Sequence, residues 1–287
     1  MNHELLTDFI AEYPAQPATA FLRAIEIDAF HRAEIPEGRG LDVGCGDGKL
    51  TRIILAKTGA RPLVGVDLDP LETEAAARCG LYEAVHTCSA ADTPLEDASF
   101  DFAISNSVLE HIPDVESVLA ETGRVTKPGG VFIITVPTIG FRANMSGPLF
   151  GGDRAAYLDL LDKRLAHFHY HDEAGWRAML DRAGFDLETV FGYLDRRECQ
   201  RWETLSRMTG GLLYRIAGAS ARPIELQRRL GMRQAQNRLR LPRFLASTIG
   251  RIVAAGHGGT PAYWSSDAGL ADGEAGCLLL IARRRAA

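Results

Sequence analysis

The sequence predicts an α/β fold with a doubly wound, mostly parallel sheet of seven strands. Between residues 39 and 136, short apolar runs alternate with segments of helical length and spacing. Strands that alternate with helices in this way form βαβ units, whose strands are parallel and whose helices cover both faces of the sheet. A glycine-rich junction at 44–48 follows the first strand, where such sheets place a ligand-binding turn.

The first 37 residues are expected to form an N-terminal helical cap. Apolar residues recur there at helical spacing, and Pro36 and Gly38 end the pattern. The apolar stripe consists of Phe21, Leu22, Ile25 and Phe30.

The core is expected to span residues 38–194, and residues 276–287 are expected to supply its final strand. The predicted strands span 39–44, 62–68, 82–88, 99–105, 131–136, 185–194 and 276–284. The predicted helices span 47–57, 70–79, 116–126, 153–166 and 172–183.

Residues 195–275 separate the last two strands and are predicted to form an arginine-rich helical insertion. From Arg196 to Arg251 the sequence contains thirteen arginines, no lysine and three acidic residues. Arginine suits bidentate recognition of phosphate or carboxylate groups. GC-rich codon usage would give the same composition, so the arginines alone do not define a partner.

An amphipathic pattern within this insertion, at 221–256, leaves several roles open. Its apolar stripe consists of Phe244, Leu245, Ile249, Ile252 and Val253, flanked by Arg243 and Arg251. Such a helix can be a lid over the active site or a contact in a homodimer. It can dock on an anionic membrane surface or a lipid substrate. It can also bind an anionic soluble partner.

Charge and cysteine content favour a cytoplasmic protein, with peripheral membrane contact through 221–256 as the alternative. The 287 residues carry a formal net charge of −5, whereas dedicated nucleic-acid binders are usually basic, so no nucleic-acid partner is expected. The five cysteines are scattered without a CxxC pair, which is typical of reduced thiols. The first residues lack a signal-peptide pattern, and no apolar run approaches the ~18–20 residues that span a bilayer.

The stretch LDVGCGDGKL, residues 41–50, places three glycines where a strand turns into a helix. Glycine adopts unusual backbone angles and lets a ligand approach the main chain closely. The following helix offers N–H groups to an anionic group. A nicotinamide-binding fingerprint would need glycine at position 49, which is Lys49, and the Gly-Lys-Ser/Thr of a phosphate-binding loop is absent.

The second predicted strand ends in an acid, Asp67, nineteen positions after Gly48. A carboxylate at this place accepts hydrogen bonds from the ribose hydroxyls of an adenosine. The segment offers no arginine or lysine placed for a pyrophosphate. The two strand ends therefore predict a nucleoside ligand with an uncharged or zwitterionic tail.

Four motifs resemble, in order and spacing, the class I S-adenosylmethionine-dependent methyltransferases of the type 11 branch, which includes ubiquinone- and menaquinone-biosynthesis enzymes. The motifs are LDVGCGDG, VGVDLDP, DASFDFAISNSVLEHIPD and VTKPGGVFIITVP. The match covers residues 38–137 and, more loosely, 165–194. The resemblance implies a Rossmann-like core with an antiparallel last strand, S-adenosyl-L-methionine as cofactor, and methyl transfer without a metal.

The resemblance also implies cofactor contacts at the first two strand ends. Asp42 and the backbone of Gly44, Cys45 and Gly46 would hold the methionine end of the cofactor. Asp67 would bind the ribose. From the residues alone, Asp42 can instead be a local cap, since Asp often caps turns.

The adenine contacts depart from the family pattern. Leu68 would pack on one adenine face. The family usually places an acid before its "LP" loop to accept a hydrogen bond from the adenine amino group, and here that position is Ser89, followed by Ala90. Either Ser89 accepts this bond or Asp92, nearby, substitutes for it.

The acceptor end is expected at the tip of the fourth strand. Asn106 and Ser107 would line the floor near the sulfonium. Methyl transfer from a sulfonium is an in-line displacement that depends mainly on positioning, and a hydroxyl acceptor also needs a base. His111, in LEHIPD, is the first candidate for this base. The alternative is a role in packing the cofactor or stabilising the loop.

A second histidine group lies in LAHFHYHDEAGW, residues 165–176. In an extended segment His167, His169 and His171 share one side, and Tyr170 lies on the other. Three imidazoles on one face suit zinc. The alternatives are a substrate or base role for one of them, or a structural lead into the next helix. We treat these four residues as candidate catalytic groups and, from the resemblance, expect no metal.

Together these features predict methyl transfer from S-adenosylmethionine to a small-molecule acceptor, with oxygen favoured over nitrogen or carbon. Lipid-, quinone- and sugar-like acceptors fit. The fourth strand end reads SNSVLEH and lacks the Asn/Asp-Pro-Pro-aromatic motif of enzymes that methylate nucleobase amines. The alternatives are a nucleic-acid or protein methyltransferase that uses the arginine surface, and a non-catalytic cofactor-binding regulatory module.

Overall fold

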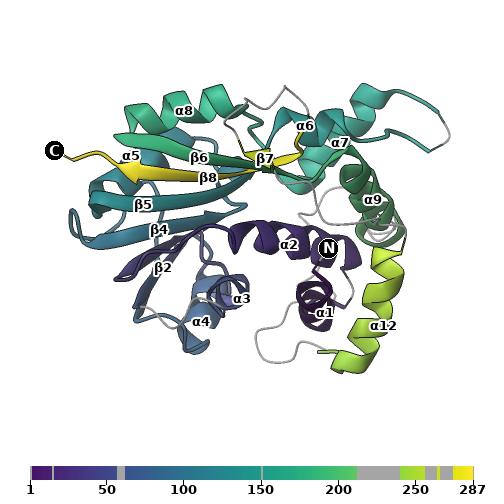
Figure 1. Ribbon diagram of the computed structural model, residues 1–287, viewed down its shortest axis with the longest axis horizontal. Coiled ribbons are helices and arrows are strands. Elements are labelled where there is room, and N and C mark those ends of the chain that lie inside the picture. Colours follow the sequence, from purple (N-terminus) through teal and green to yellow (C-terminus); the bar gives the residue numbers. More distant parts are fainter. Residues whose placement is uncertain are drawn as a thin grey trace.

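The protein folds around one mixed β-sheet with helices on both faces (Figure 1). The computed structural model describes residues 2–14, 16–56, 62–149, 151–211, 240–255, 264–265 and 274–286. Statements below refer to these residues.

The described sheet has the strand order β3-β2-β1-β4-β5-β8-β6-β7. Strands β1 to β5 pair in parallel, whereas β8 runs antiparallel between β5 and β6. The predicted seven-stranded, mostly parallel sheet with an antiparallel last strand is confirmed, and β7 adds a two-residue edge strand that the sequence did not predict. The strands are β1 Gly40–Val43, β2 Leu63–Asp67, β3 Ala84–Thr87, β4 Phe100–Asn106, β5 Thr126–Pro137, β6 Phe185–Tyr193, β7 Trp264–Ser265 and β8 Cys277–Arg284.

The strand order reverses between β1 and β4. From β1 the chain adds β2 and β3 on one side and then returns to place β4 on the other. Open α/β sheets bind ligands beyond the carboxyl ends of the strands at such a reversal. The ends of β1, β2 and β4 therefore mark the region where a ligand is expected.

Two apolar cores form because successive strand residues point to opposite faces. Ile104 and Ile133 face the core shared with the N-terminal helices, whereas Ala103 and Phe132 face the core under α5 and α8. The helices are α1 His3–Glu12, α2 Pro17–Phe30, α3 Lys49–Leu55, α4 Pro70–Arg78, α5 Val115–Val125, α6 Ile139–Ala143, α7 Arg154–Leu165, α8 Glu173–Arg182, α9 Arg196–Ser206 and α12 Arg243–Ala254. Two shorter turns are η1, Leu109–His111, and η2, Arg207–Gly211.

Helix α2 buries its predicted apolar stripe. Phe21, Ile25 and Phe30 are fully buried in the core. The helix also contacts α1, α9 and β6. The N-terminal segment therefore contributes to the main core.

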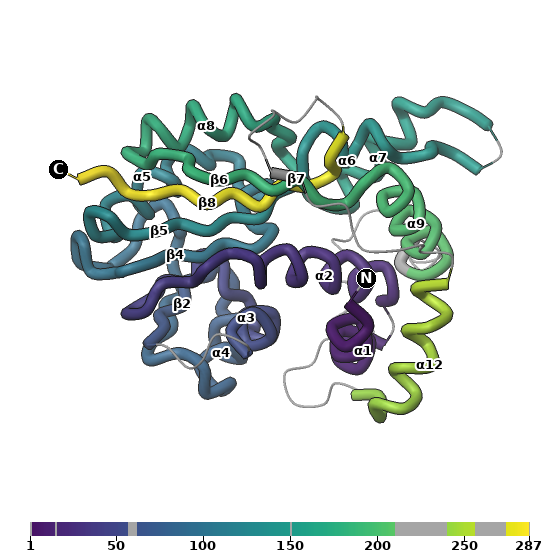
Figure 2. Tube along the Cα trace, viewed as in Figure 1, coloured from purple at the N-terminus to yellow at the C-terminus, as the bar shows by residue number. Residues whose placement is uncertain are grey.

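Helix α12 packs on α1 through small residues (Figure 2). Ala246 and Gly250 are buried, and a Cβ at Gly250 would lie 3.7 Å from Ile10 Cδ1 of α1. Phe244 and Ile252 are 70% and 67% exposed. The predicted apolar stripe is therefore divided, since Val253 is buried whereas Phe244 and Ile252 are exposed, and the roles proposed for it stay predictions.

Two arginines of this region pair with acids of α1. Arg243 contacts Asp8 at 2.8 Å, and Arg240 contacts Glu12 at 2.9 Å. The rest of the amphipathic pattern, residues 221–239, lies outside the described ranges. Among the described helices, none has both the length and the apolarity that a membrane-spanning segment requires.

Candidate functional site

The turn after β1 takes its shape from three glycines. Gly44, Gly46 and Gly48 have φ values of +78°, +52° and +73°, the left-handed region that favours glycine. The N–H groups of Gly44 and Cys45 both donate to Val66 O, at 2.9 and 3.0 Å. These bonds fix the turn against the end of β2.

The three glycines differ in what surrounds them. A Cβ at Gly44 would collide with Val108, and one at Gly48 would lie 2.8 Å from the Tyr82 ring. At Gly46 the nearest atom would be Glu72 Oε2, at 4.0 Å. The turn is therefore packed at two glycines and unobstructed at Gly46, which is the position that a ligand can approach.

Asp67 closes this turn from the end of β2. Its Oδ2 accepts a hydrogen bond from Gly46 N, and its Oδ1 accepts one from Asp69 N, both at 2.9 Å. These bonds fix the carboxylate, and each oxygen keeps a further lone pair for a hydroxyl donor. Burial raises the pKa of Asp67. The position suits a ribose-binding acid.

Asp42 lies beneath the turn and is buried. Its Oδ2 accepts hydrogen bonds from Thr51 Oγ1 and Tyr82 OH, both at 2.6 Å. Burial raises the pKa of Asp42 to about 6. These contacts make Asp42 an anchor of α3 and of the segment after α4. Its predicted contact with the cofactor stays a prediction.

The predicted adenine contacts follow β2 and β3. Leu68 is 75% exposed, so its apolar side chain is available for a flat ring. Ser89 Oγ accepts a hydrogen bond from Ala91 N at 3.2 Å, and Ser89 O accepts one from Asp92 N at 3.2 Å. Ser89, Ala90 and Asp92 thus belong to one short turn.

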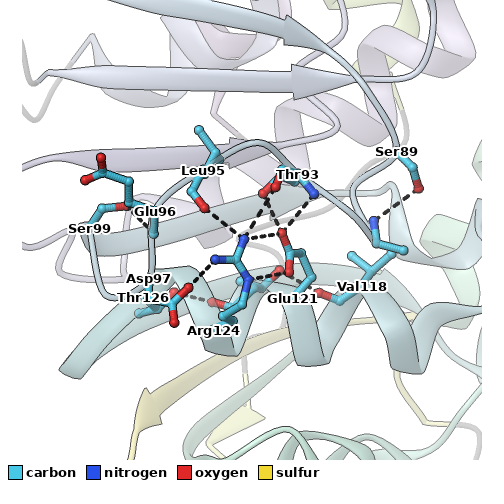
Figure 3. Close-up of polar contacts among 12 residues, drawn as sticks. Ser89, Thr93, Leu95, Glu96, Asp97, Ser99, Val118, Glu121, Arg124 and Thr126 are labelled. Carbon is cyan, nitrogen blue, oxygen red and sulfur yellow. Dashed lines mark hydrogen bonds and ion pairs between the residues drawn. The ribbon is translucent and has the colours of Figure 1, made fainter.

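An arginine of α5 holds the segment that follows this turn (Figure 3). Arg124 binds both oxygens of Glu121, at 2.7 and 2.8 Å, and donates to Leu95 O at 2.9 Å. Thr93 donates to the same Glu121 through N and Oγ1, at 2.9 and 2.5 Å. The Arg124 guanidinium lowers the pKa of Glu121 to about 2. This network positions the loop that carries the adenine candidates, and the sequence did not predict it.

The end of β4 is bound by helix α2. Asn106 Nδ2 donates to Thr135 Oγ1 at 2.9 Å, and Arg23 of α2 donates to Asn106 Oδ1 at 3.0 Å. Ser107 has a φ of +49°, and its Oγ donates to Glu26 of α2 at 2.5 Å. The two predicted floor residues therefore lie under the N-terminal helical cap.

Glu26 is the centre of a buried polar network that sequence reasoning missed. It also pairs with Arg23 and accepts a hydrogen bond from Tyr193 OH, at the end of β6, at 3.2 Å. The sequence does contain a signal for this network, namely the charged pair Arg23 and Glu26 within the apolar stripe of α2. A charge that is buried with such a stripe needs partners. The middle of α2 thus lies over the carboxyl ends of β4 and β6.

Next along the chain, η1 places Glu110 and His111 together. Glu110 is buried, its Oε2 has no hydrogen-bond partner among the described residues, and burial raises its pKa to about 8. His111 Nε2 lies 3.8 Å from Glu110 Oε1, and His111 Nδ1 lies 3.0 Å from Ala166 O. Burial lowers the pKa of His111. Sequence reasoning singled out His111 and overlooked its buried neighbour.

His167 joins this pair from the segment after α7. The rings of His111 and His167 have centroids 5.1 Å apart. His167 Nδ1 lies 2.9 Å from Tyr170 OH, which donates to Asp162 Oδ1 at 2.6 Å. Burial lowers the pKa of His167 to about 3, so this ring is neutral.

The expectation that the three alternating histidines share one side is wrong. Residues 167–171 belong to no strand of the described sheet, and α7 ends just before them at a left-handed residue, Ala166, with φ +58°. His167 bonds to Tyr170, which was expected on the opposite side. His169 instead contacts Ile112 O at 2.8 Å, and His171 stacks on His169. The structure therefore separates His167 from the other two.

The chain is similar in sequence to known methyltransferases. A family model described as a methyltransferase domain matches residues 41–134. A ubiquinone biosynthesis O-methyltransferase of Xanthomonas oryzae pv. oryzae is 31% identical over 211 residues, which cover 69% of this chain and 82% of that protein. One from Hahella chejuensis is 38% identical, covering 37% of this chain and 46% of that protein. The chain spans about half the length of several curated relatives that it matches.

Solved structures share the fold. An S-adenosylmethionine-dependent methyltransferase of Thermotoga maritima, described as a possible histamine N-methyltransferase, aligns with a TM-score of 0.54 and 17% identity, covering 98% of this chain and 99% of that one. A protein of Galdieria sulphuraria, described as a putative sarcosine dimethylglycine methyltransferase, gives a TM-score of 0.51 and 19% identity, covering 90% of this chain and 81% of that one. At such identities the likeness concerns the architecture.

Proposed function

Because the chain belongs to the S-adenosylmethionine-dependent methyltransferases, we propose that it transfers a methyl group from S-adenosyl-L-methionine to a small-molecule acceptor. One observation carries the proposal: the fixed carboxylate of Asp67, the unobstructed Gly46 and the exposed Leu68 lie at adjoining strand ends. The acid can accept hydrogen bonds from a ribose, the bare backbone can lie against a zwitterionic tail, and the apolar side chain can cover an adenine.

The residue types at these positions suit the parts of the cofactor. Asp67 would accept the ribose hydroxyls, and the backbone at Gly46 would face the methionine part. Leu68 would cover the adenine, whose amino group would meet the turn of Ser89 and Asp92. When bound, the cofactor supplies an electrophilic methyl group. The protein has to hold the acceptor in line with it and exclude water.

We infer that the accepting atom is an oxygen. A hydroxyl must lose its proton to react, and the end of β4 offers groups that can receive one. His111 Nδ1 faces a carbonyl oxygen, which only accepts, so Nδ1 carries the hydrogen and Nε2 keeps its lone pair. The 31% identical relative is itself an O-methyltransferase. Quinol-, lipid- and sugar-like hydroxyl compounds are therefore the acceptors to test first.

The cofactor site is tested by Asp67→Asn. This change keeps the size of the side chain and removes its charge. A hydrogen bond to a charged group contributes about 1.5–3 kcal/mol, so affinity for S-adenosylmethionine should fall about 10- to 150-fold in calorimetry.

The matched control is Asp186→Asn, at the amino end of β6, where the acid pairs with Arg285 on the surface. It should leave cofactor affinity unchanged. Equal affinities of the Asp67 variant and the parent protein would contradict the proposed site. Tight cofactor binding without methyl transfer to any hydroxyl, amine, RNA or protein acceptor would instead favour a regulatory module.

A further inference from the structure

Three groups that can bind a cation meet beside the end of β4. They are Glu110 and His111, from η1, and His167, from the segment after α7. One ligand atom from each lies within 4.8 Å of the other two. We propose that Glu110, His111 and His167 form a binding site for one divalent transition-metal ion of the zinc type.

Each of the two histidines uses its Nδ1 hydrogen in a hydrogen bond, which leaves the lone pair of its ring on Nε2. As argued above, His111 carries its hydrogen on Nδ1. Tyr170 donates its own hydrogen to Asp162, so its oxygen acts as the acceptor for His167 Nδ1. Both imidazoles therefore have an unprotonated Nε2. A ligating histidine that donates its other N–H to an oxygen is the usual arrangement around a bound metal.

Glu110 adds an acceptor that lacks a partner. The residue is 2% exposed, and within the described part of the chain its buried Oε2 has no hydrogen bond. Leaving a buried polar atom unpaired costs free energy, and such atoms are uncommon in folded proteins. Two imidazole lone pairs and a carboxyl oxygen form a cluster that a divalent cation can occupy by displacing the Glu110 proton. A cation satisfies all three.

The residue types select the kind of ion. Two histidines and one carboxylate are the protein ligands of many catalytic zinc sites and of two-histidine-one-carboxylate iron sites, which keep positions open. Calcium and magnesium prefer all-oxygen sites. Ligand atoms around a tetrahedral zinc lie about 3.3 Å apart, as follows from Zn–N and Zn–O lengths of about 2.1 Å. His111 Nε2 and Glu110 Oε1, at 3.8 Å, need only a small approach.

The position gives the ion a role, which rests on the proposed function. The cluster adjoins Asn106 and Ser107, where the acceptor is expected. An ion with an open position would polarise an acceptor hydroxyl, lower its pKa and favour release of its proton to solvent. His111 then acts as a ligand rather than as a base. This inference departs from the expectation, drawn from the family resemblance, that no metal is bound.

The test is zinc binding by the full-length, untagged protein after chelator treatment, without S-adenosylmethionine or an acceptor. Equilibrium dialysis with zinc chloride and elemental analysis should give one zinc per chain. Glu110→Gln, His111→Ala and His167→Ala should each weaken this binding by about 100-fold or more. Tyr170→Phe, which removes the hydrogen-bond acceptor of His167, should weaken it about 10- to 100-fold.

The matched control is His169→Ala, a histidine of the same segment that contacts Ile112 O. It should bind zinc like the parent protein. Replacing zinc with cobalt should give a tetrahedral visible spectrum that the three ligand variants lose and the control keeps. Circular dichroism identifies any variant that fails to fold. In that case the zinc affinity of Glu110→Gln, which keeps the shape and volume of the side chain, decides whether these residues bind the ion.

Two results would overturn the inference. One is the absence of saturable zinc uptake by the parent protein. The other is uptake that Glu110→Gln and His167→Ala leave unchanged, which would place the zinc elsewhere. Zinc binding and cofactor binding are measured separately. Asp67→Asn should lose the cofactor and keep the zinc, so failure of the metal site and failure of the proposed function give different results.

Discussion

The cofactor end and the acceptor end of the site are built in different ways. At the predicted cofactor end, most of the proposed ligand-facing groups come from one stretch, residues 42–68, with the turn of Ser89 and Asp92 beside it. Much of this geometry is backbone: left-handed glycines and N–H groups that donate to Asp67. At the acceptor end, Glu26, Glu110 and His167 come from three separate parts of the chain. Only tertiary packing brings their side chains together.

This difference predicts which substitutions each end of the site tolerates. A turn fixed by its own backbone depends on glycine at given positions, which a sequence displays directly. A cluster of buried polar side chains depends on every partner being present, because each removal leaves another group unpaired. We therefore expect substitutions at the acceptor end to cost stability and those at the cofactor end to cost mainly affinity.

The largest expected effect is at the acceptor end, in Glu26→Ala. This change leaves Arg23 without its buried partner and removes the acceptor of Ser107 and Tyr193. Removing one partner of a buried ion pair typically costs about 3–5 kcal/mol. Urea unfolding should show this loss. The control is Glu74→Ala, which breaks an exposed pair with Arg78 and should cost less than about 0.5 kcal/mol. Equal losses of unfolding free energy in the two variants would contradict the expectation that the buried pair contributes more stability than the surface pair.

A second effect follows from the protonation of Glu110 in metal-free protein. Its pKa is raised from 4.5 to about 8, so between these values the folded state holds a proton that the unfolded state has released. Stability contributed by this proton is present below pH 4.5 and is lost as pH rises toward 8. Glu110→Gln cannot lose a proton.

With EDTA present, the stability of Glu110→Gln relative to the parent protein should therefore increase by about 4 kcal/mol between pH 5 and pH 8.5. Denaturant unfolding across this range measures it. A difference that stays constant with pH would instead show that Glu110 is ionised in the folded protein throughout this range.

The smallest effect compares two glycines of one turn. Gly44→Ala and Gly46→Ala both force alanine into the left-handed region, which costs about 1–2 kcal/mol. Gly44→Ala also collides with Val108, so it should be less stable than Gly46→Ala by about 1–3 kcal/mol. Thermal unfolding measures this difference. Gly46→Ala, by contrast, should bind S-adenosylmethionine more weakly, and normal affinity there would argue against a ligand over Gly46.

The fold was predictable because hydrophobic periodicity and glycine positions are local properties. The sequence placed Asp67 and Asn106 at strand ends, and the structure has them there. The roles of these residues in binding remain predictions. Local reasoning failed for His167, because tertiary packing places it against His111 and Tyr170, whereas His169 contacts Ile112 O.

By itself, the sequence determined the doubly wound sheet and the glycine turn with its acid. These depend on strand periodicity, and on backbone angles that glycine alone adopts readily. Only the tertiary structure decided that Glu26 of the N-terminal segment would bind the end of β4, and that Glu110 would face His111 and His167. Side chains from distant segments meet through packing, and no local pattern in the sequence predicts that contact.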